Sequence, residues 1–214
     1  MAVQVRIDTG AAPPAEAVAA PLVLEHPHTS TGLDNRKLLM WAFLASDCMF
    51  FGTLIATYMV YKNRSIDGPL PRETFDVPYT SVSAFVLLLS SLTMVLALAA
   101  IQSGQERRMR VWLSATALLG CVFLGGQFYE FTTFYRDGLT LSSNLFGSTF
   151  FTLTGFHGTH VFIGVFWLGS LVAQSFRGRL HQQDSLWVEI AGLYWHFVGI
   201  VWILIFTLVY LIPD

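Results

Sequence analysis

Five long apolar runs constrain the fold of this chain more than any other feature of its sequence. They cover residues 38–61, 79–101, 111–134, 146–176 and 186–212. A helix needs about 20 mostly apolar residues to cross the hydrocarbon core of a bilayer. Because a lipid-exposed segment must satisfy its own backbone hydrogen bonds, each run is predicted to be helical. We therefore expect an all-α integral membrane protein, a bundle of five transmembrane helices.

The composition agrees with a membrane class. Hydrophobic residues make up 54% of the 214 positions and charged residues only 12%, about half of the charged share of a soluble domain. The formal net charge of −2 gives no reason to expect a nucleic-acid partner. Residues 1–35 are rich in Ala and Pro and are predicted to form a flexible cytoplasmic tail before one membrane domain, residues 36–214. Cys48 and Cys121 lie within apolar runs, so we expect neither a disulfide nor a metal ligand there.

The basic residues that flank the runs predict the orientation, since cytoplasmic loops carry an excess of Lys and Arg. Eight of them fall on the side of the N-terminus: Arg6, Arg36, Lys37, Arg107, Arg108, Arg110, Arg177 and Arg179. Four fall on the other side: Lys62, Arg64, Arg72 and Arg136. The N-terminus is therefore expected in the cytoplasm and the C-terminus outside.

Four ionisable residues are expected at similar depth near the middle of the bilayer: Asp47, His157, His160 and His196. The depth follows from the rise of about 1.5 Å per helical residue. His157 and His160 stand three residues apart in TLTGFHGTHVFIGVFW, so their imidazoles are expected on one face. Ionisable residues at this depth are rare and by default indicate a functional site.

Asp47 has two expected states, because a charged Asp at mid-membrane is costly. Either desolvation keeps it neutral, or it pairs with a donor at its own depth, for which His157, His160 and His196 are candidates. It would act either as a proton-relay carboxylate or as a polar latch between packed helices. The sequence favours the latch.

Further polar residues are expected in interhelical or lipid-headgroup contacts. Gln127 and Glu130 form a pair three residues apart near the outer end of the third run. Glu189, two turns before His196, begins the last run, where the helix dipole would stabilise it. Haem ligation would need facing histidines such as His160 and His196, and a carboxylate-bridged metal pair would need Glu-x-x-His repeats, which are missing here. We therefore expect no catalytic residue and no metal ligand in this chain.

Small and aromatic residues have structural explanations. The stripes Gly120–Gly125–Gly126 and Gly155–Gly158–Gly164 are predicted to be helix-packing surfaces. Several aromatic residues stand toward the ends of the runs, which is typical of interfacial belts. Trp195 and Tyr58 are among them.

Four segments together resemble subunit III of haem–copper oxidases. WAFLASDCMFFGTLIATY, residues 41–58, resembles the carboxylate-bearing helix of that family, and GQFYEF, residues 126–131, its Gln-x-x-Glu-Tyr element. TGFHGTH, residues 154–160, and EIAGLYWHFVGIVW, residues 189–202, are similar to its other recognisable stretches. The four lie in order across four of the five runs. Gly199 is a departure, because the family usually has Asp there.

This resemblance implies the short five-helix bacterial form of the subunit, a multi-pass protein of the bacterial plasma membrane. It implies an accessory role in aerobic respiration, within a complex that reduces oxygen and translocates protons. Haem and copper would lie in partner subunits, while this chain would be non-catalytic. The implied contacts are subunit I chiefly, then subunit II, small subunits and bound phospholipid. The implied work is to support proton uptake and turnover stability.

Two alternatives stay open at this point. The electron donor of the oxidase is cytochrome c or a quinol, and the general resemblance favours cytochrome c. A different class of function is a stand-alone proton-coupled transporter that uses Asp47 and the layer of His157, His160 and His196. Such transporters often have inverted repeats and broken helices, which the apolar runs do not show.

Overall fold

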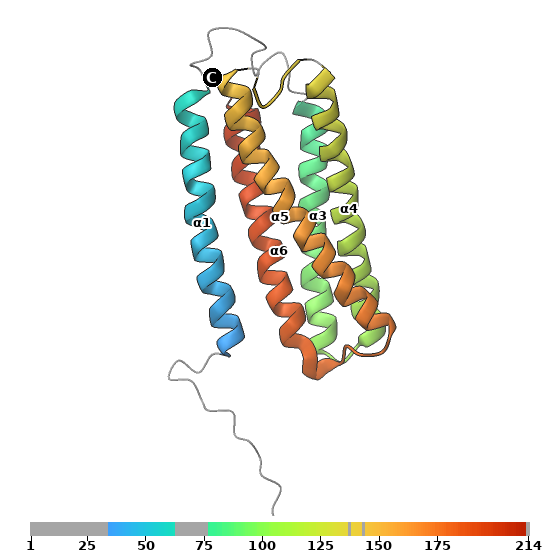
Figure 1. The fold of residues 1–214 in the computed structure, drawn as a ribbon. Coiled ribbons are helices and arrows are strands. Elements are labelled where there is room, and N and C mark those ends of the chain that lie inside the picture. The colour runs from blue at the N-terminus through green and yellow to red at the C-terminus, as the bar shows by residue number, and fades with distance from the viewer. Residues whose placement is uncertain (1–33, 63–76, 137, 143, 213–214) are drawn as a thin grey trace, which may run out of the picture. The chain divides into compact units, whose positions relative to one another are not determined.

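The computed structural model describes residues 34–62, 77–136, 138–142 and 144–212, and they fold into long helices that run in alternating directions (Figure 1). The helices are α1 (Asn35–Tyr61), α3 (Val77–Gln102), α4 (Glu106–Arg136), α5 (Leu145–Phe176) and α6 (Ser185–Ile205). A short 3-10 turn, η1 (Gln182–Asp184), precedes α6, and a π-helical stretch, η2 (Phe206–Leu211), continues it. No strand occurs in these described ranges.

The five predicted spans are confirmed: each helix is long and apolar enough to cross a membrane, with η1, α6 and η2 counted as one. All five helices begin earlier than predicted, α5 and α6 by one residue and the others, at Asn35, Val77 and Glu106, by two to five. Asp34 caps α1 by accepting a hydrogen bond of 2.8 Å from the Arg36 backbone N–H. The predicted tail lies almost wholly outside the described residues, as residues 1–33, so the boundary expected after residue 35 stays a prediction. Which end of the helices faces the cytoplasm stays a prediction.

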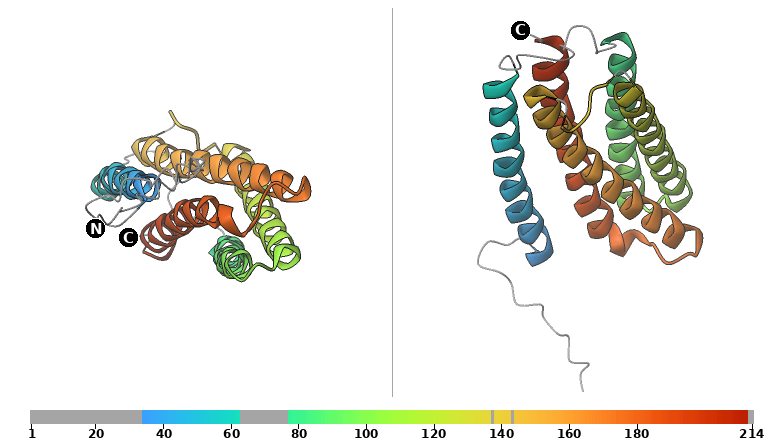
Figure 2. Two further views of the ribbon diagram at one scale, coloured as in Figure 1. Left: turned by 90° about the horizontal axis from the view of Figure 1, so that it is seen from below. Right: turned by 45° about the horizontal axis from the view of Figure 1, so that its top comes forward.

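Four helices form a ring, and the fifth stands beside it. In the ring α3 packs on α4, α4 on α5, α5 on α6, and α6 on α3. α1 packs against α5 and α6, as the view along the helices shows (Figure 2). α5 is inclined to its neighbours, which accommodates its 32 residues (Figure 1).

α1 uses one narrow stripe to reach the ring. Leu44, Phe51 and Tyr58, spaced seven residues apart, are its buried residues. A seven-residue repeat is the period of a helix that packs along one seam. The remaining surface of α1 carries exposed apolar side chains, as expected for a helix with lipid or another protein chain around it.

Trp195 of α6 fills the centre of the ring. A β-carbon built on Gly120 of α4 would lie 2.7 Å from its indole, and one built on Gly164 of α5 would lie 2.9 Å away. Its Nε1–H donates a hydrogen bond of 2.9 Å to Ser90 Oγ of α3. One side chain therefore joins all four helices, and close approach of the indole requires glycine at both positions.

Two expectations are corrected by this core. Trp195 and Tyr58 are 1% and 0% exposed, so they are core residues and do not belong to an interfacial belt. The glycine stripes pack only in part, because a β-carbon on Gly125, Gly155 or Gly158 would meet nothing within 4 Å. Spacing alone cannot tell which glycine in a stripe lies opposite a bulky neighbour.

Candidate functional site

A mid-helix polar contact joins α1 to α5. Asp47 Oδ2 lies 3.4 Å from His160 Nε2, and the two side chains are 13% and 16% exposed. The structure therefore selects His160 among the three histidines that were candidate partners of Asp47. At this distance the contact is electrostatic and not a hydrogen bond, and Asp47 Oδ2 has no hydrogen-bond partner among the described residues.

The other ring nitrogen of His160 is held within its own helix. Nδ1 lies 2.8 Å from the carbonyl oxygen of Phe156, one turn earlier in α5. Because a carbonyl oxygen only accepts, Nδ1 is the donor in this contact. The contact orients the ring so that Nε2 lies toward Asp47.

Aromatic rings from α1 and α6 surround this pair. The ring of Phe51 lies edge-on to His160 at 5.0 Å between centroids. Tyr194 donates a hydrogen bond of 2.9 Å from its hydroxyl to the carbonyl oxygen of His160, and its ring stacks with Phe43. The pair therefore sits where α1, α5 and α6 meet.

His157 lies deeper than its neighbour. Its side chain is fully buried and stacks on Trp202 at 5.1 Å, with Phe51 and Phe123 both at 6.3 Å. Neither ring nitrogen has a hydrogen-bond partner among the described residues. The expectation that both imidazoles face one way is thus wrong in part: a step of three residues turns the helix by about 60° short of a full circle, so only His160 reaches Asp47.

Of the two predicted site residues on α6, Glu189 has an ionic partner on α1 and His196 has no polar partner among the described residues. Glu189 forms an ion pair with Lys37 of α1, a contact that the helix-dipole explanation did not anticipate. His196 is half-buried, on a different side of α6 from Tyr194, and its ring makes no hydrogen bond with the described residues. Of the residues expected at one depth, His196 therefore does not contact Asp47, while their common depth in the bilayer stays a prediction.

Gln127 and Glu130 lie together, as their spacing predicts. Gln127 Nε2 donates to Glu130 Oε2 at 3.2 Å, and the Thr80 hydroxyl of α3 donates to Glu130 Oε1 at 2.7 Å. Both side chains are nearly inaccessible. These contacts join α3 to α4 near the end where α4 finishes.

Gly199 marks a close approach of α6 to α3. A β-carbon there would lie 3.3 Å from the Ser91 hydroxyl oxygen. An acidic side chain, which the resemblance leads one to expect at this position, would therefore stand next to that hydroxyl.

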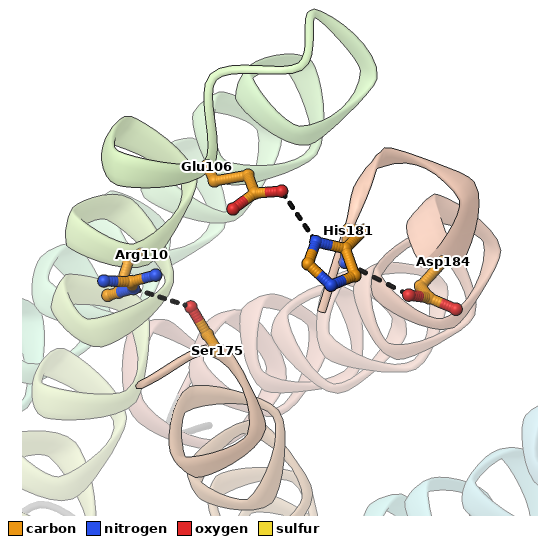
Figure 3. A network of polar contacts seen from close by, with 5 residues as sticks. All are labelled: Glu106, Arg110, Ser175, His181 and Asp184. Atoms are coloured by element: carbon orange, nitrogen blue, oxygen red, sulfur yellow. Dashed lines mark hydrogen bonds and ion pairs between the residues drawn. The ribbon is translucent and has the colours of Figure 1, made fainter. Parts of the chain in front are cut away.

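A further polar network, which the sequence reasoning missed, lies where α4 begins and α5 ends (Figure 3). His181 Nδ1 lies 2.8 Å from Glu106 Oε1, and the His181 backbone N–H donates to Asp184 Oδ2 at 3.1 Å. Arg110 Nε donates to Ser175 Oγ at 3.1 Å. The hydrogen bond and charge of Glu106 raise the pKa of His181 above its usual 6.5. The spacing of His181 and Asp184 is a capping signal, but nothing in the sequence connects either with Glu106, 75 residues earlier.

No group of three or more His, Cys, Asp or Glu side chains that could hold a metal ion occurs in the parts of the chain that the structure describes. Asp47 with His160 and Glu189 with Lys37 are instead pairs across helix seams. What this arrangement does most directly is hold α1 against α5 and α6. Lys62 adds a third tie by donating to the Ile212 carbonyl oxygen at 2.9 Å.

Comparison with known proteins identifies the family. The family model described as "Cytochrome c oxidase subunit III" matches residues 18–213. Quinol oxidase subunit 3 of Bacillus subtilis is 42% identical over 171 residues, which is 80% of this chain and 84% of that protein. Cytochrome c oxidase subunit 3 of Bacillus sp. PS3 is 37% identical over 83% of this chain and 86% of its own length.

A third relative comes from a bacterium outside the genus Bacillus. Cytochrome bo(3) ubiquinol oxidase subunit 3 of Pseudomonas aeruginosa is 38% identical, over 87% of this chain and 88% of that protein. The match covers all five helices and every polar contact described above. The chain therefore belongs to the subunit III family of haem–copper oxidases.

Proposed function

We propose that this chain is the non-catalytic support subunit of a proton-pumping terminal oxidase in the bacterial plasma membrane. It packs chiefly against subunit I, with subunit II and small subunits as further neighbours, and it binds phospholipid. It maintains proton uptake and stability during turnover. Family membership replaces the hypothesis of a stand-alone transporter.

The Asp47–His160 pair is the observation that carries a support role. Its two side chains come from different helices, and Asp47 Oδ2 lies 3.4 Å from His160 Nε2. Such a pair stabilises the seating of α1 without needing a path for protons. We therefore assign Asp47 and His160 to a latch between helices.

Haem and copper are proposed to lie in the partner subunits. The histidines of α5 and α6 do not offer a facing pair of ring nitrogens for haem. His160 contacts Asp47 and the carbonyl oxygen of Phe156. His157 is enclosed by Phe51, Phe123 and Trp202. His196 lies on a different side of α6 from Tyr194, the residue that bonds to the carbonyl oxygen of His160.

The electron donor is proposed to be cytochrome c or a quinol, decided by the other subunits. Relatives named as quinol oxidase subunits, at 42% and 38% identity, support the quinol alternative as well as cytochrome c. Oxidation of reduced cytochrome c, compared with oxidation of a quinol by the same purified complex, separates the two.

Purification in a mild detergent tests the proposal. We expect haem-bearing large subunits to co-purify with this chain, and the complex to show a haem Soret band. The chain released from the complex by a harsher detergent is expected to show no such band. Purification of this chain alone from membranes that contain an assembled oxidase would contradict the proposal.

A further inference from the structure

We propose that the pocket where α3 ends and α4 begins binds the phosphate group of an anionic phospholipid. The pocket has a volume of about 630 Å³ and is lined by Leu96, Arg107, Arg108, Val111 and Trp112. It is an open depression on the surface of the bundle and not an enclosed cavity. The inference rests on the lipid-binding part of the proposed function and on no contact with another subunit.

The two arginines supply a positive site that nothing in the fold uses. Within the described residues, neither guanidinium has an ion pair or a side-chain hydrogen bond. Arg110, one turn further, is by contrast bonded to Ser175 and lies over the ring of Phe176. Arginine presents a planar fork of N–H donors that matches phosphate oxygens in pairs, so Arg107 and Arg108 suit a phosphodiester.

The rest of the pocket suits the acyl part of the same molecule. Leu96 comes from α3, one and a half turns before that helix ends, while Val111 and Trp112 follow the arginines by one turn of α4. Val111 is 61% exposed and Trp112 36%, so both face the surroundings of the bundle. Tryptophan is typical of the level of lipid headgroups, and aliphatic side chains beside it contact acyl chains.

A neighbouring pocket at the same end of the bundle is less suited to an anion, because an acidic residue lines it. It has a volume of about 550 Å³ and is lined by Gly104, Glu106, His181, Gln182 and Gln183. The carboxylate of Glu106 faces it and is engaged with His181. The first pocket therefore combines cationic and apolar lining in a way that its neighbour does not.

The location agrees with the predicted orientation. This end of the bundle is the one predicted to be cytoplasmic, and the cytoplasmic leaflet carries the anionic lipids. A basic pair just beyond a transmembrane span is the pattern that such headgroups attract. A free phosphate ion has the same headgroup chemistry, so the test separates the two sources.

The test counts the phospholipids retained by the intact oxidase complex, by native mass spectrometry in a mild detergent. We expect the Arg107→Gln/Arg108→Gln variant to retain one anionic phospholipid fewer than the wild type. Adding back phosphatidylglycerol should restore it at about tenfold higher lipid concentration than in the wild type. Phosphatidylcholine should not restore it.

Arg177→Gln/Arg179→Gln is the matched control. It removes two exposed arginines from the same end of the bundle, outside the pocket, and should retain the full lipid count. If the double variant of the pocket does not assemble, the single variants Trp112→Leu and Arg108→Gln replace it in the test. Each of them should weaken phosphatidylglycerol binding severalfold.

Three outcomes would overturn the inference. The first is that the pocket variant and the wild type retain equal numbers of anionic lipids, and the second is that the control loses as many as the pocket variant. The third is that inorganic phosphate at millimolar concentration displaces the lipid and binds in its place. Haem-bearing subunits are detected in the same spectra. A failure of the proposed oxidase assembly is therefore visible separately from a failure of the lipid site.

Discussion

His160 is held from two sides, by the carbonyl oxygen of Phe156 at Nδ1 and by Asp47 at Nε2. Both ring nitrogens therefore face partners within this chain, and these partners fix the ring between α1 and α5. At the scale of single residues, the geometry favours a latch.

The Asp47→Asn substitution tests the latch. Asn has nearly the shape of Asp and carries an amide group that can hydrogen-bond to Nε2 of His160, so the contact between α1 and α5 is kept while the carboxyl group is lost. We expect the oxidase complex to assemble with an unchanged thermal midpoint and oxygen reduction to fall only in part. Asp47→Leu, which removes the contact, should lower the midpoint. Complete loss of oxygen reduction in an intact Asp47→Asn complex would show direct proton transfer through Asp47.

Glycine positions differ sharply in what they tolerate. A methyl group on Gly120 meets the indole of Trp195 at 2.7 Å and Val165 at 2.8 Å, whereas one on Gly158 meets nothing. Gly120→Ala should therefore destabilise the fold by about 1–3 kcal/mol, the usual cost of overpacking a core. Gly158→Ala is the matched control and should not destabilise the fold, since the added methyl group meets nothing and Ala favours a helix more than Gly does. Loss of helical circular dichroism on heating measures both, and equal midpoints would contradict the packing around Trp195.

At the scale of helices, the amino-acid sequence predicts the elements much better than their contacts. All five spans follow from apolar runs, because lipid permits few alternatives to a helix. The partner of Asp47 could be narrowed to three histidines and no further. Lys37 and Glu189 stand 152 residues apart, and a contact at that separation depends on how helices rotate against one another, which local pattern does not encode.

The candidate site shows the same limit. Gln127 and Glu130 were predictable as a pair because both stand on one helix, three residues apart. His157 and His160 have the same spacing, yet their neighbours differ, since α1 lies beside one ring and the aromatic core beside the other. Spacing fixes the angle between two side chains on a helix, while the packing of other helices decides what each of them meets.

The connection between α5 and α6 is predicted to loosen as pH rises. The pKa of His181 is raised in the fold by Glu106. The stabilisation is therefore fully present below about 6.5, the unfolded value, and is lost as pH rises through the higher folded value. Amide hydrogen exchange of residues 178–184, corrected for the intrinsic effect of pH, should show protection that declines above pH 6.5.

Glu106→Gln separates this effect from other titrations. It removes the charge that His181 faces, so protection of residues 178–184 should be lower and should no longer depend on pH in this range. Arg179→Gln, which changes a charge in the same segment without touching the pair, should retain the wild-type profile. A decline that persists in Glu106→Gln would assign the pH dependence to another group.

For the whole molecule, five antiparallel crossings place the connections on alternate sides. The α3–α4 and α5–α6 connections lie at one end, and the α4–α5 connection lies at the other (Figure 1). The count of basic residues predicts the first of these ends in the cytoplasm. The end with the α3–α4 and α5–α6 connections therefore faces either the cytoplasm or the outside, and chemical labelling of a few positions distinguishes the two orientations.

Labelling of single-cysteine variants determines the orientation. The background replaces Cys48 and Cys121, both exposed, with alanine. Ser103→Cys and Gln183→Cys probe one end and Ser142→Cys the other, and all three positions are exposed. In intact cells, an impermeant maleimide should label only Ser142→Cys, while permeabilised cells should show all three labelled.

The three positions distinguish two kinds of error. Labelling of Ser103→Cys and Gln183→Cys alone in intact cells would invert the orientation and contradict the charge count, while the arrangement of helices would stand. Labelling of only one of these two would contradict the fold itself, because two further crossings, α4 and α5, return the chain to the same end. The fold therefore makes the stricter prediction, that Ser103 and Gln183 react alike whichever side they face.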